Sequence, residues 1–207
     1  MAVFFRALTV TERTTVVDLG GAASTWDWLD VRPRLVLVNL DADCPRDGFD
    51  SVVADALASP FRDGSFDVVF SNSLIEHLGT KQRQEAFASE VRRLSKTGYF
   101  VQTPNKWFPI EPHYLAPLVQ FVPRKIRPAV IRWMTPFGWL RKPSREECRG
   151  ICREIRLLSA REMRRLFPDA DIVRERFLGV TKSLMAVRRS NGAGAARPIQ
   201  RHPAQTQ

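Results

Sequence analysis

The sequence contains one run of small residues that could hold a ligand close to the backbone. The run is Asp18-Leu19-Gly20-Gly21-Ala22-Ala23-Ser24, and it follows the β-branched residues Val16 and Val17. β-Branched residues favour a buried strand, and paired glycines permit a tight turn that a ligand can approach closely. In an open α/β sheet, such a turn between strand and helix holds a nucleotide at the carboxyl end of the strand. We therefore expect Asp18, Gly20, Gly21 and Ala22 to bind a nucleotide-like cofactor, although the segment taken alone is equally compatible with an ordinary turn.

The dinucleotide pattern G-x-G-x-x-G is absent, because the chain has G-G-A-A-S-T in its place. Polar residues instead end each of the next three apolar runs. Asn39 and Asp41 follow the second run, about 20 residues beyond the glycine turn, where an acid meets the ribose of a bound nucleotide. Asp55 and Ala56 follow the third run, and Asn72 follows the fourth. We expect these residues to complete the cofactor site, with Asp41 favoured over Asn39 as the ribose ligand.

A histidine and a carboxylate lie together in the loop after the fifth apolar run. Glu111 and His113 stand close in sequence, in a loop that is also rich in proline and aromatic residues. A neighbouring carboxylate fixes the tautomer of a histidine, which can then act as a general base. We expect His113, supported by Glu111, to deprotonate or orient a substrate, against the alternative of an ordinary loop histidine. His77, which follows Glu76, is a second candidate catalytic residue, although a histidine at a helix start more often caps or packs.

Alternating strands and helices must position these residues. The apolar periodicity predicts strands at residues 15–19, 35–39, 51–54, 66–71 and 98–103, helices at 24–30, 80–95 and 159–167, and a closing hairpin of strands at 171–178 and 181–188. This order indicates an α/β fold: a mostly parallel seven-stranded sheet with helices on both faces and an antiparallel strand at its end. Ligands of such sheets bind at the carboxyl ends of the strands, so the residues named above should meet there.

These segments together resemble the class I S-adenosylmethionine-dependent methyltransferases, in particular the small-molecule branch called type 11. The most specific similarity runs from Asp55 to Val69, where D-A-L-A-S-P-F-R-D-G-S-F-D-V-V is very similar to the family's D-A-x-x-L-P-F-x-D-x-S-F-D-V-V. The stretch from Thr103 to His113 is similar to the family's T-P-N-x-x-x-P-x-E-x-H, and the resemblance covers residues 14–189. It implies a Rossmann-like methyltransferase fold, S-adenosylmethionine as the cofactor, methyl transfer as the activity, and no metal ion.

Three positions depart from the family pattern. Ala22 and Ser24 stand where the family's loop has its second and third glycines, and both residue types disfavour a positive φ. Asn39 stands where the family has an acidic ribose ligand, and an amide bonds a hydroxyl without the help of a charge. These departures leave open a degenerate protein that binds the cofactor without turnover.

The residues after the fourth strand bear on the methyl acceptor. Ser71-Asn72-Ser73-Leu74 is not the Asn/Asp-Pro-Pro-aromatic motif of enzymes that methylate amino groups of nucleic-acid bases and glutamine. We therefore expect an oxygen or carbon atom of a small-molecule or lipid-like acceptor. A nucleic-acid acceptor is the alternative, and only charge supports it, because 32 Lys and Arg residues outnumber 22 Asp and Glu residues to give a formal net charge of +10.

Basic and aromatic residues are interleaved between residues 124 and 165. Such a mixture suits an anionic membrane surface with rings at the headgroup level, and it also suits nucleic-acid phosphates. A solvated basic face is the third reading. Prolines divide the segment, so one long amphipathic helix is not expected. We expect residues 107–150 to form an insertion that caps the acceptor site and touches anionic membranes peripherally.

The length of 207 residues suits one domain, which we expect over residues 1–189, followed by a disordered tail at 190–207. No apolar run of roughly 18 residues predicts a membrane span, and no signal peptide is evident. The three cysteines, Cys44, Cys148 and Cys152, complete no zinc pattern and indicate free thiols in the cytoplasm. Residues 9–13 are all that we expect of a lid before the first strand, either because the lid is lost or because the chain begins further upstream. The oligomeric state stays open.

Overall fold

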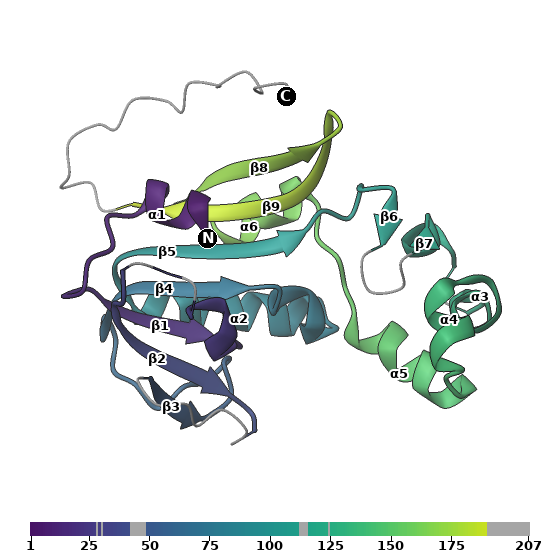
Figure 1. Ribbon diagram of the computed structural model, residues 1–207, viewed down its shortest axis with the longest axis horizontal. Helices are drawn as coiled ribbons and strands as arrows, with labels where there is room; N and C mark the ends of the chain where they lie inside the picture. Colours follow the sequence, from purple (N-terminus) through teal and green to yellow (C-terminus); the bar gives the residue numbers. More distant parts are fainter. Residues whose placement is uncertain (28, 30, 42–48, 112–115, 124, 190–207) are drawn as a thin grey trace.

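Seven strands form one open sheet at the centre of the molecule (Figure 1). The computed structural model describes residues 1–27, 29, 31–41, 49–111, 116–123 and 125–189. The strands are β1 (Thr15–Leu19), β2 (Arg34–Asn39), β3 (Asp50–Val53), β4 (Phe66–Asn72), β5 (Ser95–Pro104), β8 (Asp171–Phe177) and β9 (Val180–Arg188). Their order across the sheet is β3-β2-β1-β4-β5-β9-β8. The mostly parallel seven-stranded α/β sheet that the sequence predicts is confirmed.

The antiparallel strand of this sheet is β9. It pairs antiparallel with β5 on one side and with β8 on the other, whereas β1 to β5 pair parallel with one another. Because the closing hairpin inserts its second strand beside β5, β9 lies second from the edge and β8 forms the edge. The antiparallel terminal strand that the sequence predicts is confirmed, because β9 is the last strand of the chain and pairs antiparallel with both of its neighbours.

One face of the sheet is covered by α2 (Lys81–Leu94) and α6 (Ala160–Leu166). Phe87, Val91 and Leu94 of α2 recur at helical spacing and are fully buried against the strands. The Thr80 hydroxyl begins α2 by accepting a hydrogen bond of 3.2 Å from the backbone N–H of Arg83. These two helices match those predicted at 80–95 and 159–167.

The other face of the sheet is covered by α1 (Ala2–Ala7) and by a cluster of aromatic rings. Phe4 is fully buried, and its ring centroid lies 4.9 Å from that of Phe70, 5.6 Å from that of Phe100 and 5.9 Å from that of Trp26. These edge-to-face contacts add to the free energy gained by removing the rings from water. The short N-terminal helix is therefore an integral part of the core.

Two local predictions at the N-terminal end of the chain are wrong. The residual helix lies at Ala2–Ala7 and packs on the sheet, whereas residues 9–13 form no helix. The helix predicted at 24–30 is a single 3-10 turn at Ala23–Thr25 among the described residues of that range. The reason is that the Trp26 side chain turns inward, where it is 2% exposed, packs against Phe4 and Phe70 and donates a hydrogen bond to Asp18.

Residues 107–154, which we call the cap, project beyond the carboxyl ends of β4 and β5 (Figure 1). The cap contains the short strands β6 (Ile110–Glu111) and β7 (Ala116–Pro117), the 3-10 turn η3 (Val119–Phe121), and the helices α3 (Arg127–Met134), α4 (Pro136–Arg141) and α5 (Arg145–Glu154). It has a small core of its own, in which Ile131 and Cys148 are fully buried. The backbone N–H of Arg156 donates a hydrogen bond of 2.7 Å to the carbonyl of Glu76, which ties the end of the cap to the loop after β4.

The prolines of the cap start helices. Pro128 and Pro136 lie in the first turns of α3 and α4, where the missing N–H groups have no intrahelical partner to lose. Ser144 and Glu147 form a capping box at the start of α5. Short helices result, as the sequence predicts, and no helix in the described part of the chain is long and apolar enough to cross a bilayer. The tail predicted to be disordered, 190–207, lies outside the described residues.

The Phe4→Ala substitution tests the role of α1 in the core. Removing a fully buried ring should lower the free energy of unfolding by about 3–5 kcal/mol, because a cavity replaces the ring contacts. The matched control is Leu178→Ala, which shortens a side chain that is 88% exposed and should change stability by less than about 0.5 kcal/mol. Urea unfolding followed by tryptophan fluorescence measures both. Equal stability of the two variants would show that α1 does not belong to the folded core.

Candidate functional site

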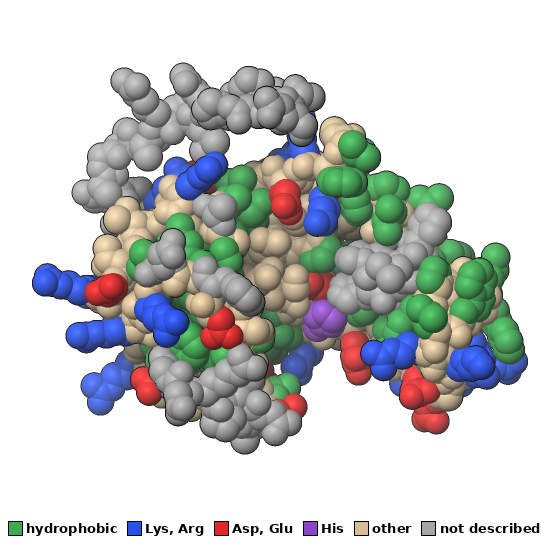
Figure 2. All heavy atoms as spheres, viewed as in Figure 1, with side chains coloured by type: hydrophobic (Ala, Val, Ile, Leu, Met, Phe, Trp, Pro, Cys, Tyr) green, Lys and Arg blue, Asp and Glu red, His purple; other side chains and the backbone are tan. Residues whose placement is uncertain are grey.

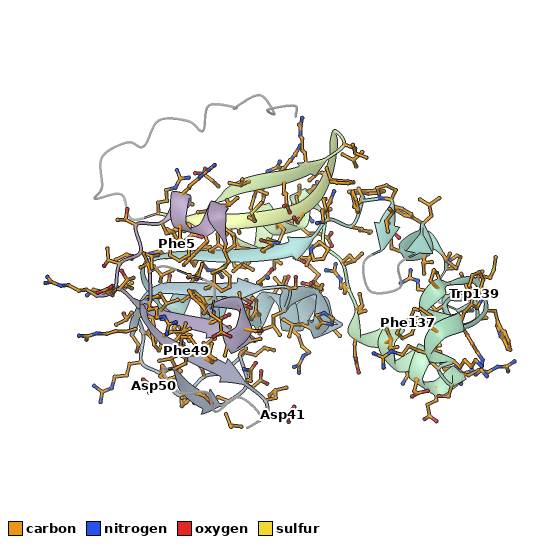
Figure 3. The ribbon with its side chains drawn as sticks, viewed as in Figure 1. Phe5, Asp41, Phe49, Asp50, Phe137 and Trp139 are labelled. Atoms are coloured by element: carbon orange, nitrogen blue, oxygen red, sulfur yellow. The ribbon has the colours of Figure 1, made fainter. Side chains whose placement is uncertain are left out.

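A cavity of about 440 Å³ lies at the carboxyl ends of β1, β2 and β3. Seven of the predicted cofactor residues line it, namely Gly20, Gly21, Ala22, Asn39, Asp41, Asp55 and Ala56. Its wall is completed on one side by Leu74 and Leu78, which follow β4. Figure 3 shows Asp41 at the outer end of this region, beyond β2. The strand order thus brings together residues that are spread over some sixty positions of the sequence, and we call this space the cofactor cavity.

Asp18 lies beneath the glycine turn and does not line the cofactor cavity. Its carboxylate is fully buried, and its Oδ2 accepts a hydrogen bond of 2.8 Å from the Trp26 indole Nε1. Its Oδ1 has no hydrogen-bond partner among the described residues. Burial raises the pKa of Asp18 from 3.8 to about 7, although the bond from Trp26 acts in the opposite direction. Asp18 therefore supports the turn from below.

The glycines of the turn are required by space as well as by conformation. A Cβ atom on Gly21 would lie 1.8 Å from Asp18 Oδ2, and Gly20 has a φ of +74° with the Leu74 side chain pressed against it. The Asn39 side chain donates a hydrogen bond of 2.9 Å to the Gly21 carbonyl, which ties the turn to the end of β2. The turn is therefore fixed on three sides, and its remaining side faces the cofactor cavity.

The small residues that replace the family's glycines fit their backbone conformation. Ala22 has φ −109° and ψ 137°, which is extended backbone that alanine adopts readily, and Ser24 lies within the 3-10 turn. Neither position has the positive φ that favours glycine. Nothing in the turn's backbone therefore points to a degenerate cofactor loop.

The Asp55 loop is held in place by α2. The Asp55 side chain accepts a hydrogen bond of 3.0 Å from the backbone N–H of Leu57, and the Ser59 backbone donates one of 2.9 Å to Glu90 of α2. Arg93 of α2 donates bonds of 2.7 Å to the Phe61 carbonyl and to the Asp63 carboxylate. The P-F-x-D-G-S-F block of the sequence is therefore largely structural, since it fixes Asp55 and Ala56 at the cofactor cavity.

A second cavity, of about 260 Å³, lies at the ends of β4 and β5 beside the closing hairpin. It is lined by Asn72, Ser73, Gln102, Pro104, Phe108, Glu175, Lys182 and Ser183, and we call it the acceptor cavity. Ser73 lines this cavity, whereas the next residue, Leu74, lines the cofactor cavity. Ser73 has a φ of +58°, which is strained for a residue other than glycine and is often associated with a functional site. Two consecutive residues, Ser73 and Leu74, therefore line the two cavities.

The acceptor cavity contains polar groups that the sequence analysis missed. The Glu175 carboxylate accepts a hydrogen bond from the Ser183 hydroxyl across the hairpin, and Lys182 lies beside them. The Asn105 side chain donates a hydrogen bond of 2.9 Å to the Thr181 carbonyl, which ties the hairpin to the loop after β5. Sequence carried no signal for these residues, because only the insertion of β9 beside β5 brings the hairpin to the ends of the central strands.

The predicted catalytic residues are only partly placed. His113 lies outside the described residues, and Glu111 is placed through its backbone, which pairs with Ala116 between β6 and β7. His77 lies in the 3-10 turn η2 (Ile75–Leu78), where it is exposed and lines neither cavity. Asn72, predicted to bind the cofactor, lines the acceptor cavity instead.

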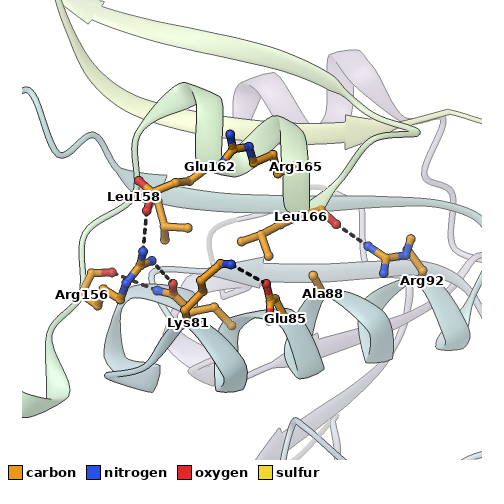
Figure 4. Close-up of a pocket in the computed structure, with 10 residues that line it drawn as sticks. Lys81, Glu85, Ala88, Arg92, Arg156, Leu158, Glu162, Arg165 and Leu166 are labelled. Carbon is orange, nitrogen blue, oxygen red and sulfur yellow. Dashed lines mark hydrogen bonds and ion pairs between the residues drawn. The ribbon is translucent and has the colours of Figure 1, made fainter.

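A third cavity, of about 370 Å³, lies between α2 and α6 (Figure 4). Lys81 pairs with Glu85 at 3.2 Å, Arg156 pairs with Glu162 at 2.5 Å, and Arg92 donates a hydrogen bond to the Leu166 carbonyl. These contacts hold the two helices together, and none of the residues involved lines either of the other cavities. Among the described residues, no group of three or more His, Cys, Asp or Glu side chains could hold a metal ion.

Residues 9–102 match the family model Methyltransf_11, described as a methyltransferase domain. A segment covering 40% of this chain is 33% identical over 89 residues to tRNA (carboxymethyluridine(34)-5-O)-methyltransferase of Xenopus tropicalis, and it spans only 14% of that protein. The family match covers β1 to β4 and most of β5, and so includes every strand whose end lines the cofactor cavity.

Solved structures share the fold. A S-adenosylmethionine-dependent methyltransferase from Methanosarcina mazei superposes with a TM-score of 0.55 at 12% identity, over 92% of this chain and 98% of that one. The 1,6-didemethyltoxoflavin-N1-methyltransferase of Burkholderia thailandensis, solved with 1,6-didemethyltoxoflavin and S-adenosylhomocysteine, gives 0.52 at 14% identity, over 86% of this chain and 72% of that one. At these identities the likeness establishes the Rossmann-like methyltransferase fold.

The Gly21→Ala substitution tests the cofactor cavity. The new Cβ would collide with the Asp18 carboxylate, so the turn must shift and the affinity for S-adenosylhomocysteine should fall by roughly tenfold or more. The matched control is Gly150→Ala in α5, where a Cβ meets no atom within 4 Å and affinity should be unchanged. Titration calorimetry measures both, with thermal unfolding to confirm that each variant folds. Wild-type affinity in Gly21→Ala would remove the turn from the site.

Asp18 should make stability depend on pH. Below about pH 3.8 the carboxyl is protonated in both states, but between that pH and about 7 the unfolded chain releases a proton that the folded chain retains. The contribution of Asp18 to the free energy of unfolding should therefore fall as the pH rises over this window, and then level off. Asp18→Asn keeps an acceptor for Trp26 but does not titrate, so its stability relative to wild type should rise by a few kcal/mol between pH 4 and 8. A difference in the free energy of unfolding between Asp18→Asn and wild type that stays constant with pH would contradict a raised pKa for Asp18.

Proposed function

We propose that this chain is a class I S-adenosylmethionine-dependent methyltransferase of type 11, with S-adenosylmethionine as its cofactor, and that its acceptor is a small or lipid-like molecule. The observation that supports this proposal is the acceptor cavity, which is lined by Ser73, while the next residue, Leu74, lines the cofactor cavity. Its volume of about 260 Å³ suits a small molecule or the reactive end of a longer one. We propose an oxygen atom of the acceptor as the methylated atom, ahead of carbon, because the polar lining suits a hydroxyl or carboxyl group.

Different residues of the cofactor cavity would bind different parts of S-adenosylmethionine. We propose that the backbone of Gly20 to Ala22 lies against the amino-acid part of the cofactor, that Asp41 or Asn39 holds the ribose, and that Asp55 and Ala56 flank the adenine. Since Asn39 already donates a hydrogen bond to the turn, Asp41 is the better candidate for the ribose. The rigid support of Asp55 by α2 favours this arrangement because it fixes the cavity before the cofactor binds.

When bound, S-adenosylmethionine supplies an electrophilic methyl group on a sulfonium. The chain must then orient the acceptor oxygen for an in-line approach and receive its proton as the new carbon–oxygen bond forms and the carbon–sulfur bond breaks. Glu175 lies in the acceptor cavity, and the loop that begins at Phe108 leads to Glu111 and His113. We propose that His113 accepts the proton, while Glu175 and Lys182 orient the polar end of the acceptor.

A nucleic-acid acceptor is the second candidate. Its support is the similarity to the Xenopus tropicalis enzyme, whose name gives a tRNA nucleoside as its target, together with the net charge of +10. The small-molecule proposal is preferred because the matched segment covers only 40% of this chain and 14% of that enzyme. For location we propose the cytoplasm, where Cys148 and Cys152 would stay reduced.

Transfer of a labelled methyl group tests the proposed function. Purified protein, S-adenosylmethionine with a labelled methyl group and an extract of the source cells are incubated, and the products are separated into small-molecule, lipid, RNA and protein fractions. Label should enter the small-molecule or lipid fraction. Label in RNA would favour the second candidate instead, and cofactor binding with no transfer into any fraction would contradict enzymatic activity.

The His113→Ala and Glu175→Gln substitutions test the proposed roles on the acceptor identified in this way. Loss of a general base should lower kcat by roughly 10²-fold, whereas loss of an orienting carboxylate should mainly raise KM for the acceptor. Glu12→Gln changes an exposed acid remote from both cavities and serves as the control. The affinity for S-adenosylhomocysteine should be the same in all three variants. Unchanged turnover in His113→Ala would remove that residue from the mechanism.

A further inference from the structure

Exposed apolar side chains gather at one end of the molecule. Of the large hydrophobic residues that are exposed in the described part of the chain, all but Leu40 and Val53 lie in residues 107–140 or at the hairpin tip, residues 177–180. Figure 2 shows them as hydrophobic patches over the cap and the hairpin tip, at the right of the view. This end also carries the carboxyl ends of β4 and β5 (Figure 1). Exposed apolar surface on this scale marks an interaction site.

The most exposed of these side chains are aliphatic as well as aromatic. Leu140 is 82% exposed and Met134 70% in the cap, and Leu178 is 88% exposed at the hairpin tip. Trp133 and Trp139 are also more than half exposed, and the indole Nε1 of Trp139 donates a hydrogen bond of 2.7 Å to the Trp133 carbonyl. In Figure 3, Trp139 projects from the outer side of α4, whereas Phe137 turns toward the core of the cap.

Positive charge accompanies this apolar surface. Between residues 132 and 145 the chain carries Arg132, Arg141, Lys142 and Arg145 and no Asp or Glu. The Arg132 guanidinium lies 5.1 Å from the centre of the Trp133 ring, and Arg141, Lys142 and Arg145 are exposed. Glu146 and Glu147 follow directly, and Glu147 interacts electrostatically with Arg132, so four cations face two acids over residues 132–147. Indole rings and leucine side chains beside this excess of cations are the chemistry of a peripheral membrane contact, in which rings settle at the headgroups and cations meet anionic lipids.

We propose that Trp133, Met134, Trp139 and Leu140 of the cap, together with Leu178 of the hairpin tip, form a docking surface for an anionic phospholipid membrane. The aliphatic members favour a membrane over nucleic acid, because leucine and methionine neither stack strongly on bases nor bind phosphates, whereas a bilayer takes them out of water. The cations favour a membrane over a second copy of this chain, because two such surfaces would bring like charges together.

Docking at this end has a consequence for the substrate, and this part rests on the proposed function. Phe108 and Lys182 of the acceptor cavity belong to the same two segments, the start of the cap and the hairpin, that bear the docking surface. A lipid-like acceptor would then pass from the bilayer to the acceptor cavity without crossing water. The docking surface itself requires neither turnover nor a particular acceptor.

Co-sedimentation with vesicles tests the docking surface. The wild-type protein should sediment with vesicles that contain phosphatidylglycerol and hardly at all with pure phosphatidylcholine, and binding should weaken as salt rises. The double variant Leu140→Glu/Leu178→Glu changes two almost fully exposed side chains, so the fold should survive, and vesicle binding should fall by roughly tenfold or more. Val53→Glu, at a site 58% exposed on β3, is the matched control and should bind as wild type does.

Two further measurements make the result unambiguous. Arg141→Gln/Lys142→Gln should lose the preference for anionic vesicles, since each cation near such a surface contributes about 1 kcal/mol. All variants should bind S-adenosylhomocysteine with wild-type affinity in calorimetry, so failure of docking can be told apart from failure of the methyltransferase assignment. Failure of the wild-type protein to sediment with anionic vesicles at low salt would overturn the proposed docking surface. So would vesicle binding that Leu140→Glu/Leu178→Glu leaves intact, or a dimer in solution that this double variant dissociates.

Discussion

The contact between the buried Asp18 carboxylate and the glycine turn is the constraint on which the rest of the site depends. The carboxylate fills the space that a side chain on Gly21 would need, and Trp26 holds it there through one hydrogen bond of 2.8 Å. Trp26 is in turn packed edge-on against Phe4 and Phe70. The shape of the cofactor cavity is therefore coupled directly to the aromatic core and to the N-terminal helix that completes it. Burying a carboxyl for this purpose costs stability at neutral pH, as its raised pKa indicates.

The order of the strands places two cavities at the carboxyl ends of the central strands. β1, β2 and β3 end at the cofactor cavity, whereas β4, β5 and the closing hairpin end at the acceptor cavity, with the strained residue Ser73 between them. The insertion of β9 beside β5 is what brings Glu175 and Lys182 to the second cavity. Since α2 fixes the Asp55 loop from one face and the cap is tied to the loop after β4, neither cavity depends on an isolated contact.

The sheet could be predicted from sequence because short apolar runs that end in turn residues indicate buried strands. The helices between these runs indicate that the strands are mostly parallel. The helix predicted at residues 24–30 was wrong: the described residues of that range form a single 3-10 turn. The Trp26 side chain points inward there, because its indole N–H donates a hydrogen bond to Asp18. Glu175 and Lys182 were also missed, because their role depends on pairing between distant strands and leaves no local pattern. The family motif from Asp55 to Val69 has a structural basis. Much of it attaches the loop after β3 to α2, and only its first residues line the cofactor cavity.

We propose that the methyl group passes from the cofactor cavity to the acceptor cavity at Ser73. A crystal structure of the chain with S-adenosylhomocysteine tests this most directly. We expect adenine beside Asp55 and Ala56, the ribose at Asp41 or Asn39, and the sulfur atom at Ser73, directed toward Gln102 and Glu175. S-adenosylhomocysteine bound between α2 and α6, or bound at the glycine turn with its sulfur directed away from the acceptor cavity, would contradict methyl transfer at Ser73.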